Sequence, residues 1–187
     1  GLLLSTDSLE AVTALEFPGK ATYVNRNAAS AEMVILSNLA MEETGKKRCR
    51  DNFIMGYYSG SNTHNRDFEL IEDVLLEFMK AHSEVRLKVV GCLELGAKFD
   101  AVKEQVLREG FMDWRRLPES IAEIDCNLMP LEDTIFHQCK SENKWMEAAL
   151  VGVPTIGSMN KELESATRQL ENIILCRTAE EWREGVG

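Results

Sequence analysis

Short apolar runs alternate with longer amphipathic stretches along most of the chain. Residues 53–58 form an apolar run that predicts a buried strand. Between such runs, apolar residues recur three or four positions apart. Phe68, Ile71, Leu75 and Phe78 follow this spacing and predict a helix over residues 65–81. Alternation of strands and helices is typical of βαβ units around a parallel sheet.

From residue 53 onward the pattern predicts six strands joined by helical crossovers. We expect strands over residues 53–58, 86–91, 108–112, 125–129, 154–158 and 172–176. Helices are expected over residues 65–81, 100–107, 118–124, 140–151 and 161–169, with a last one from the cap Thr178 through 182. This order predicts an α/β fold with a Rossmann-like, doubly wound parallel sheet. Ligands of such sheets bind at the carboxyl ends of the strands near the switch point, which favours the loops after the first and fourth strands.

The first fifty residues form a less regular segment. Strands are expected over residues 2–5 and 21–24, and helices over 7–16 and 27–42, followed by a polar linker over 45–52. The chain begins Gly-Leu-Leu-Leu without an initiator Met, which we interpret as a fragment boundary. We therefore divide the chain into residues 1–50 and a domain over residues 51–187.

Composition and charge narrow the classes of function. The chain has 187 residues, and no apolar run approaches the roughly 18–20 residues that span a bilayer, so we expect a soluble protein. A net charge of −10 argues against general binding of nucleic acid. The single dense basic cluster is Lys46, Lys47, Arg48 and Arg50. It is either a solvated loop or a patch that meets an anionic lipid or phosphate.

Cysteines and histidines give no sign of a metal site. The five cysteines are widely spaced without a C-x-x-C pair, and the three histidines are dispersed. Cys126 and Cys176 lie inside apolar runs, as reduced core thiols do. These features favour a reducing, cytoplasmic setting.

Two segments could carry chemistry. The loop after the first strand of the domain contains Ser59, Gly60, Ser61 and His64. Gly60 would let a ligand approach the backbone closely, and the start of the following helix favours an anion. The alternative is a plain turn and helix cap.

The second segment begins the helix expected over residues 140–151. Lys140, Lys144 and Glu147 are spaced i, i+4 and i+7, which would place them on one helix face. The two lysines and free backbone N–H groups would meet a diphosphate, and Glu147 could accept hydrogen bonds from ribose hydroxyls. The alternative is an ordinary surface helix with Lys–Glu pairs.

The segment over residues 140–155 resembles the donor-site helix of GT-B fold glycosyltransferases, and is most similar to the glycosyl transferases group 1-like members. The shared pattern is Lys140-Ser141-x-x-Lys144-x-x-Glu147-Ala148-Ala149-x-x-Gly152-x-Pro154-Thr155. Residues 56–68 resemble the first strand and loop of the same domain in polysaccharide-synthesising members, and residues 125–132 resemble the strand before the donor helix. The resemblance covers about residue 53 to the end of the chain.

The resemblance implies roles for single residues. Lys140, Ser141 and Lys144 would hold the diphosphate of a nucleotide sugar, and Glu147 would bind its ribose. Ser59, Gly60 and Ser61 would form the facing loop, the backbone at residues 130–131 would edge the base, and His64 and His137 would lie at the same edge of the sheet. A second glutamate that many retaining members carry eight residues earlier is replaced by Cys139.

The resemblance also implies an activity. The chain would be the donor-binding, C-terminal half of a GT-B glycosyltransferase, which transfers sugar to a saccharide or lipid-linked acceptor. Family members of this architecture use no metal, so none is expected here. Residues 1–50 would be the remnant of the acceptor domain and the connection between domains. Catalytic residues would come mainly from that acceptor domain, so the chain alone is expected to bind a nucleotide without transferring sugar. The location would be cytoplasmic, with peripheral membrane contact through the basic cluster.

Other classes of function compete with this interpretation. A nucleotide-sugar epimerase shares the two-domain architecture and would be recognised by a product inverted at one carbon. A degenerate glycosyltransferase-like domain without catalysis would explain Cys139. A response-regulator receiver needs an acidic pair after its first strand, where this chain has Tyr57-Tyr58-Ser59, and is disfavoured.

Overall fold

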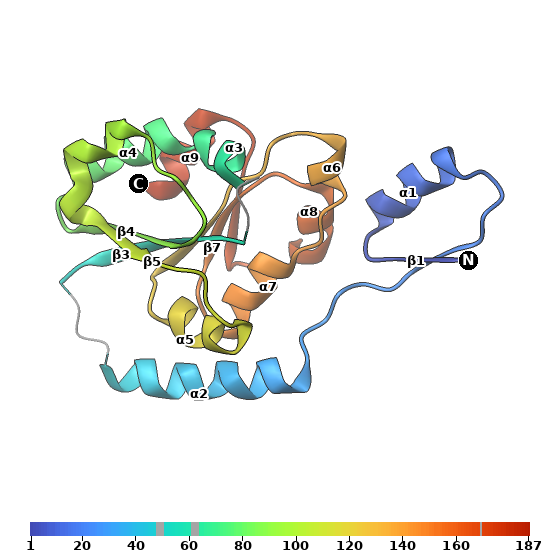
Figure 1. Cartoon of the computed structure of the whole chain (residues 1–187), viewed down its shortest axis with the longest axis horizontal. Helices are drawn as coiled ribbons and strands as arrows, with labels where there is room; N and C mark the ends of the chain where they lie inside the picture. The colour runs from blue at the N-terminus through green and yellow to red at the C-terminus, as the bar shows by residue number, and fades with distance from the viewer. Residues whose placement is uncertain (48–50, 61–63, 169) are drawn as a thin grey trace.

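The chain forms a six-stranded parallel sheet with helices on both faces, preceded by a small two-stranded unit (Figure 1). A computed structural model describes residues 1–47, 51–60, 64–168 and 170–187. The strands of the large sheet lie in the order β5-β4-β3-β6-β7-β8. Their bounds are β3 Phe53–Ser59, β4 Val85–Gly91, β5 Val106–Glu109, β6 Cys126–Met129, β7 Thr155–Ser158 and β8 Ile173–Cys176.

This strand order has its switch point between β3 and β6. Counting from β3, the order is 3-2-1-4-5-6, which is the Rossmann-like, doubly wound topology expected from the sequence. β3 pairs with β4 along its whole length but meets β6 only at Met55 and Gly56. The loops that leave β3 and β6 therefore diverge and open a crevice at the carboxyl edge of the sheet.

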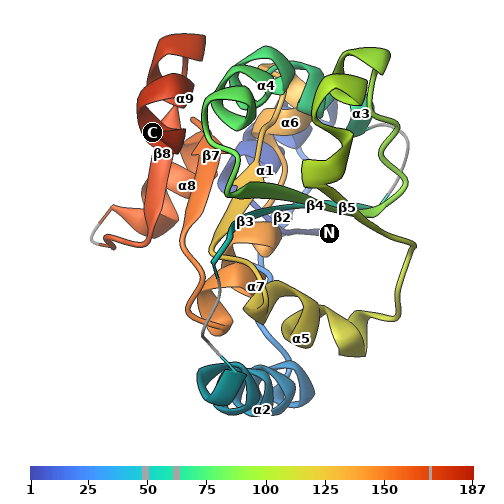
Figure 2. The same ribbon diagram turned by 90° about the vertical axis from the view of Figure 1, so that its left-hand side faces the viewer.

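Helices cover the two faces of the sheet (Figure 2). The helices α4 (Glu72–Ala81) and α9 (Ala179–Val186) pack together on one face. On the other face α5 (Leu117–Ala122) contacts both α7 (Asn143–Leu150) and the long helix α2 (Ala31–Lys47). The remaining short helices are α3 His64–Glu69, α6 Ile135–Gln138 and α8 Lys161–Thr167.

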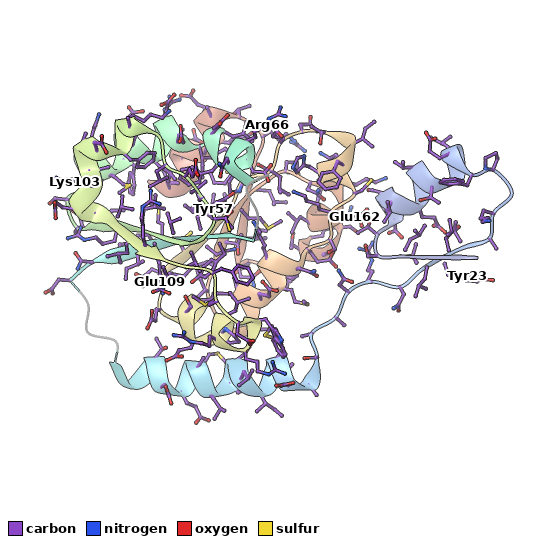
Figure 3. All side chains as sticks on the ribbon, in the orientation of Figure 1. Tyr23, Tyr57, Arg66, Lys103, Glu109 and Glu162 are labelled. Atoms are coloured by element: carbon purple, nitrogen blue, oxygen red, sulfur yellow. The ribbon has the colours of Figure 1, made fainter. Side chains whose placement is uncertain are left out.

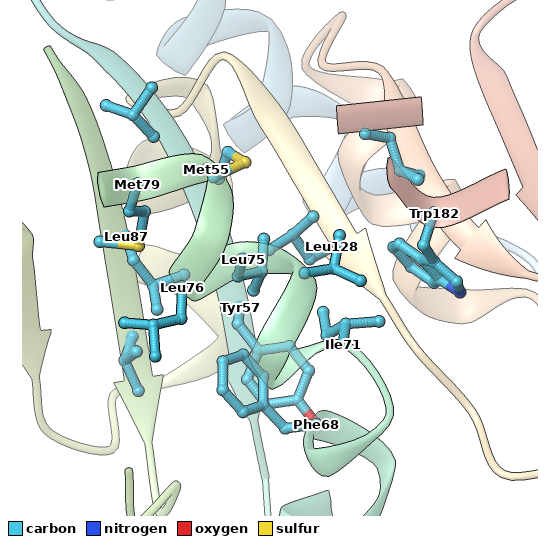
Figure 4. Packing of buried hydrophobic residues seen from close by; sticks show 14 of the residues in the cluster. Met55, Tyr57, Phe68, Ile71, Leu75, Leu76, Met79, Leu87, Leu128 and Trp182 are labelled. Carbon is cyan, nitrogen blue, oxygen red and sulfur yellow. The ribbon is translucent and has the colours of Figure 1, made fainter. Parts of the chain in front are cut away.

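The main hydrophobic core lies between the sheet and α4 (Figure 4). Leu75, Leu87 and Leu128 are fully buried there. Tyr57 on β3 packs its ring against Phe68 on α3, with 4.8 Å between the ring centroids. A second cluster on the opposite face includes Ala40, Ile121, Ile124, Ala148 and Val151. Both faces of the sheet are therefore covered, as the apolar strands predict.

The N-terminal unit consists of β1 (Leu2–Leu4), α1 (Asp7–Glu16) and β2 (Thr22–Val24). β1 and β2 pair in parallel in a sheet of their own. Thr6 caps α1 by accepting a hydrogen bond from the backbone N–H of Leu9. The unit lies beside the large sheet, next to α6 and α8 (Figure 1).

The helix predicted over residues 27–42 is misplaced. The helix α2 runs over Ala31–Lys47, because the Ser30 hydroxyl accepts the backbone N–H of Met33 and starts the helix there. Residues 45–47 of the expected linker are therefore helical. Arg48 and Arg50 of the basic cluster lie outside the described residues. Across the described part of the chain, no helix combines the length and apolar character needed to cross a bilayer.

The helix predicted over residues 65–81 is two helices, α3 and α4. The break falls at residues 70–71, where Ile71 keeps helical backbone angles but has no side-chain cap for α4. Phe68 and Ile71 are both fully buried. The apolar spacing continues through the break, because both helices turn their apolar residues to the same core.

The third strand of the large sheet lies earlier than predicted. Residues 97–105 form a 3₁₀ segment, and β5 begins at Val106, which pairs with Leu87. The predicted helix over 100–107 and strand over 108–112 are therefore wrong in position. The amide of Gln105 donates to the carbonyls of Met79, His82 and Val85, and these tertiary bonds fix the end of the 3₁₀ segment. Residues 110–113 belong to a loop.

Candidate functional site

A cavity of about 400 Å³ lies at the carboxyl edge of the sheet, at the switch point. It is bounded by the ends of β3 and β4, the loop after β5, and the helix α7. Its lining residues are Tyr58, Ser59, Gly60, Val90, Gly91, Phe111, Met112, Asp113, Trp114, Leu117, Lys144 and Glu147. This is the size and position of a small-molecule site in a doubly wound sheet.

The floor of the cavity is made by backbone. Ser59 pairs with Gly91 in the sheet register, and the Ser59 carbonyl accepts the backbone N–H of Cys92 at 3.1 Å. Gly91 has a φ of +96°, and a Cβ there would lie 2.0 Å from the Ser59 oxygen. Only glycine fits this position, because any side chain would collide with the backbone of the neighbouring strand.

Two charged side chains of α7 face the cavity. Lys144 and Glu147 lie three residues apart on the helix, as the sequence predicts for these two. The Lys144 ammonium lies 5.2 Å from the centroid of the Tyr57 ring, which Figure 3 labels at the centre of the molecule. The cavity therefore offers a cation and a carboxyl group on one wall.

Burial shifts the titration of both groups. Burial lowers the pKa of Lys144 to about 8, with Asp67 and Glu147 opposing the shift and Lys140 adding to it. Burial raises the pKa of Glu147, against the opposing charge of Lys144. Both side chains are partly buried, so water has limited access to this wall, and an ionic contact with a ligand is stronger there than in water.

Lys140 and Ser141 do not lie where the sequence predicted. The helix α7 begins at Asn143, so these two residues precede it and do not share its face with Lys144. The Lys140 ammonium lies 3.5 Å from the Asp67 carboxylate and 5.1 Å from the centroid of the Phe136 ring. The Ser141 hydroxyl accepts the side-chain amide of Asn27 at 2.8 Å. Neither residue lines the 400 Å³ cavity.

Tertiary contacts explain why α7 starts late. The Cys139 carbonyl accepts the Thr6 hydroxyl from the N-terminal unit, and the His137 carbonyl accepts the Asn160 side chain. These bonds hold residues 137–141 in a turn, together with the bond from Asn27 to Ser141. None of these contacts is local in sequence.

The predicted loop after β3 is described only in part. Ser59 and Gly60 line the cavity as expected. Ser61 lies outside the described residues. The backbone of His64 begins α3, and its side chain lies outside the described part of the structure.

Sequence reasoning missed the loop after β5. Phe111, Met112 and Trp114 give the cavity an apolar wall, and Phe111 keeps 76% of its surface exposed. Arg115 lies over the Trp114 ring at 4.6 Å. Because residues 108–112 were predicted as a strand, they were not considered as a loop beside the site. The available signal was its position, because every loop at the carboxyl edge near the switch point is a candidate wall.

Two further cavities adjoin this edge. One of about 460 Å³ shares Trp114 and Glu147 with the first and is also lined by residues 27–30. Another of about 510 Å³ lies beyond β6, between the ends of β7 and β8, and is lined by Leu131 among others. The sequence predicted that the backbone at residues 130–131 edges the base. Leu131 instead lines this second cavity and not the one at the switch point.

Within the described residues, one group of potential metal ligands gathers at this edge, comprising Asp67, Glu132 and His137. Both ring nitrogens of His137 already have partners, at 3.0 Å to Asp67 and 2.6 Å to the Thr134 hydroxyl. Arg66 pairs with Glu132 at 2.9 Å. Burial lowers the pKa of His137, against the charge of Asp67. The group forms a hydrogen-bonded network, in which the second Asp67 oxygen accepts no hydrogen bond and faces the Lys140 ammonium at 3.5 Å.

Comparison with known proteins finds similarity in fold. No protein-family model matches the sequence, and no curated protein matches it. Among solved structures, Anabaena HepE in complex with UDP and glucose aligns with a TM-score of 0.68 at 18% identity, over 99% of this chain and 52% of that one. WaaG, a glycosyltransferase involved in lipopolysaccharide biosynthesis, aligns with a TM-score of 0.66 at 16% identity, over 98% of this chain and 53% of that one.

A third similar structure is the pneumococcal O-GlcNAc transferase GtfA in complex with UDP and GlcNAc. It aligns with a TM-score of 0.60 at 12% identity, over 98% of this chain and 36% of that one. The chain spans about half the length of HepE and WaaG. Over that length it has the fold of the GT-B glycosyltransferases, consistent with their C-terminal domain.

Proposed function

We propose that the chain is the donor-binding half of a glycosyltransferase and binds the nucleoside diphosphate of a nucleotide sugar. One observation carries this proposal. The cavity at the switch point brings the backbone of Ser59 and Gly60 together with Lys144 and Glu147. Backbone and a cation can bind phosphate groups, and a carboxyl group can accept hydrogen bonds from ribose hydroxyls.

The lining suggests how a nucleoside diphosphate lies in the cavity. The phosphates face Lys144 and the end of β3, and the ribose hydroxyls donate to Glu147. The base rests against the apolar wall that includes Phe111 and Trp114. Lys140 does not line the cavity and adds positive charge from the turn before α7, where it neighbours Lys144 closely enough to lower the pKa of Lys144. In this arrangement Ser141 has a structural role, because its hydroxyl is bonded to Asn27.

Stabilisation of the leaving diphosphate follows from the same groups. Negative charge develops on the diphosphate as the bond to the sugar breaks. Lys144 lies in a partly dehydrated wall, where a fixed positive charge stabilises that development more than it would in water. We propose that the reaction needs no metal ion.

The similar structures support UDP as the first nucleotide to test. HepE is described in complex with UDP and with UDP-glucose, and GtfA in complex with UDP and GlcNAc. Because the chain spans about half the length of HepE, we propose that an acceptor domain completes the enzyme. Residues 1–50 would belong to that domain and to the connection between the halves.

Several finer features are part of the same proposal. The acceptor is a saccharide or a lipid-linked saccharide in polysaccharide synthesis, and transfer retains the configuration of the sugar. The protein acts in the cytoplasm, with contact to the inner face of the membrane. The chain of 187 residues binds nucleotide but does not transfer sugar, because the acceptor and any general base come from the other half.

Calorimetric titration with UDP, GDP, dTDP and ADP tests the proposal. We expect saturable binding of one diphosphate, weakened at least about tenfold by Lys144→Met and by Glu147→Gln, since each removes a charged contact. Lys80→Met is the matched control, because Lys80 is exposed on α4, away from the cavity. Binding that both cavity variants leave unchanged would refute the proposed site. Binding of no nucleotide, by this chain or by a longer form with its acceptor domain, would indicate a degenerate domain.

A further inference from the structure

A buried carboxylate lies next to the two lysines of the proposed donor site. Asp67, on α3, is fully buried. One of its oxygens accepts the backbone N–H of Glu132 and the Nε2 of His137, both at 3.0 Å. Its other oxygen faces the Lys140 ammonium at 3.5 Å. Asp67 therefore joins the helix after β3 to the loop after β6, across the switch point.

Lys140 does not belong to a helix, and its position depends on contacts with Asp67 and its partners. Lys140 lies in the turn before α7, and its backbone N–H donates to the His137 carbonyl. The His137 ring donates in turn to Asp67, with its Nδ1 at 2.6 Å from the Thr134 hydroxyl. Both the backbone and the ammonium of Lys140 are thus tied to one network with Asp67 at its centre.

The charges around Lys144 need compensation. The groups that face its ammonium are Asp67 from α3, Lys140 from the preceding turn, Glu147 from α7, and the Tyr57 ring from β3. Burial and Lys140 both lower the pKa of Lys144, and Asp67 is the stronger of the two carboxylates that raise it. Two neighbouring lysines in a dehydrated wall repel each other unless a negative charge lies beside them.

We propose that Asp67 is a positioning residue of the donor site, which fixes Lys140 and compensates the charge of the two lysines from beneath the cavity. This inference rests on the proposed function. A carboxylate beside a phosphate would normally weaken binding. Asp67, however, is fully buried and does not line the cavity, whereas Lys144 does, so the ligand contacts the lysine and not the carboxylate.

The first test needs no nucleotide. NMR of the protein with ¹³C-labelled lysine follows the titration of the Lys144 side chain. In Asp67→Asn we expect the pKa of Lys144 to fall below the wild-type value of about 8. The control Asp133→Asn removes a nearby exposed carboxylate that accepts from Gln138, and should leave the titration unchanged. An unchanged Lys144 pKa in Asp67→Asn would overturn the inference.

A second variant keeps the test decisive if Asp67→Asn does not fold. Lys140→Met removes the repelling cation and leaves Asp67 facing Lys144 alone, so the pKa of Lys144 should rise. A pKa that stays constant in Lys140→Met would show that the three charges do not act together, and would overturn the inference.

The second test compares UDP with uridine, which lacks phosphates. Asp67→Asn should weaken UDP binding about tenfold and leave uridine binding unchanged, because only the lysines are disturbed. Wild-type affinity for UDP should fall as pH rises through about 8, the pKa of Lys144, and in Asp67→Asn this fall should begin at lower pH. Equal loss of both ligands would reduce Asp67 to a structural role and overturn the inference. If neither this chain nor a longer form with its acceptor domain binds UDP, GDP, dTDP or ADP while the Lys144 pKa responds as expected, the proposed function fails and the charge network stands.

Discussion

The large sheet and the N-terminal unit are both parallel βαβ arrangements, but they are stabilised differently. The large sheet has helices on both faces and a core of fully buried side chains. The N-terminal unit has two strands, one helix and exposed apolar side chains, with Leu3 at 72% and Leu15 at 82% exposure. Its contacts with the rest of the chain are largely polar. The comparison shows that one topology can be held either by its own core or by its neighbours.

Glu162 on α8 makes the densest of these polar contacts, and Figure 3 shows it on the side of the domain that faces the N-terminal unit. Only 2% of its surface is exposed. It accepts the backbone N–H of Ser8 at 2.8 Å and the Arg26 guanidinium at 2.9 Å. The position of the unit therefore depends on a few directional bonds, whereas the large sheet depends on burial of area.

The largest expected effect breaks the core of the large sheet. Leu128→Ala should lower the free energy of unfolding by about 3 kcal/mol, because it leaves a cavity in the fully buried centre of the sheet. Leu3→Ala is the matched change in the N-terminal unit and should cost less than about 0.5 kcal/mol. Urea unfolding followed by circular dichroism measures both. Similar losses would contradict the difference between the two regions.

The next effect falls on the edge of the large sheet. Gly91→Ala should cost about 2 kcal/mol, because a Cβ at φ +96° collides with the Ser59 carbonyl. It should also weaken nucleotide binding, since that carbonyl belongs to the cavity floor. Gly110→Ala is the control, because a Cβ there meets nothing within 4 Å. Urea unfolding measures the stability of both variants. Equal stability would show that the backbone at the end of β4 moves to accommodate the Cβ at little cost.

The smallest effect is expected where the two regions meet. Burial alone would raise the pKa of Glu162, but the bonds from Ser8 and Arg26 lower it overall, below the ordinary value of 4.5. The stabilisation is therefore present above about pH 4.5 and lost as pH falls through the lowered value. Hydrogen exchange should show residues 2–24 losing protection there, while β3 stays protected.

Substitution checks the same contact at neutral pH. Glu162→Gln should loosen the N-terminal unit by about 1 kcal/mol, and the control Glu164→Gln, exposed on the same helix, should not. If the exchange of α1 is identical in the two variants, the polar contact does not hold the unit.

Sequence patterns predicted the large sheet because its strands are apolar and its crossovers have helical period. Cys126 and Cys176 are buried, with pKa values raised by burial to about 12 and about 11, as expected of core thiols. The patterns failed where long-range contacts override local preference. Gln105 ends a 3₁₀ segment through bonds to three distant carbonyls, and the turn at residues 137–141 is fixed by Thr6, Asn27 and Asn160.

The candidate site was predictable only where its residues lie on regular secondary structure. Lys144 and Glu147 lie on a regular helix, where spacing determines the face they share. Lys140 lies before that helix, in a turn that spacing cannot reveal. Asp67 stood in the sequence only as one polar residue of an amphipathic helix. Its partners His137 and Lys140 lie about seventy residues further along, and only the sheet topology brings them together.

Trp114 and Glu147 line two cavities, the one at the switch point and the one that residues 27–30 also line. Any ligand that moves these two side chains from one side changes the space available on the other. Thermodynamic linkage is reciprocal. If one conformation of residues 27–30 raises the affinity for the ligand, bound ligand raises the population of that conformation by the same free energy. One coupling free energy therefore links two properties: how far the first cavity is occupied, and which conformation residues 27–30 adopt on the way from the N-terminal unit.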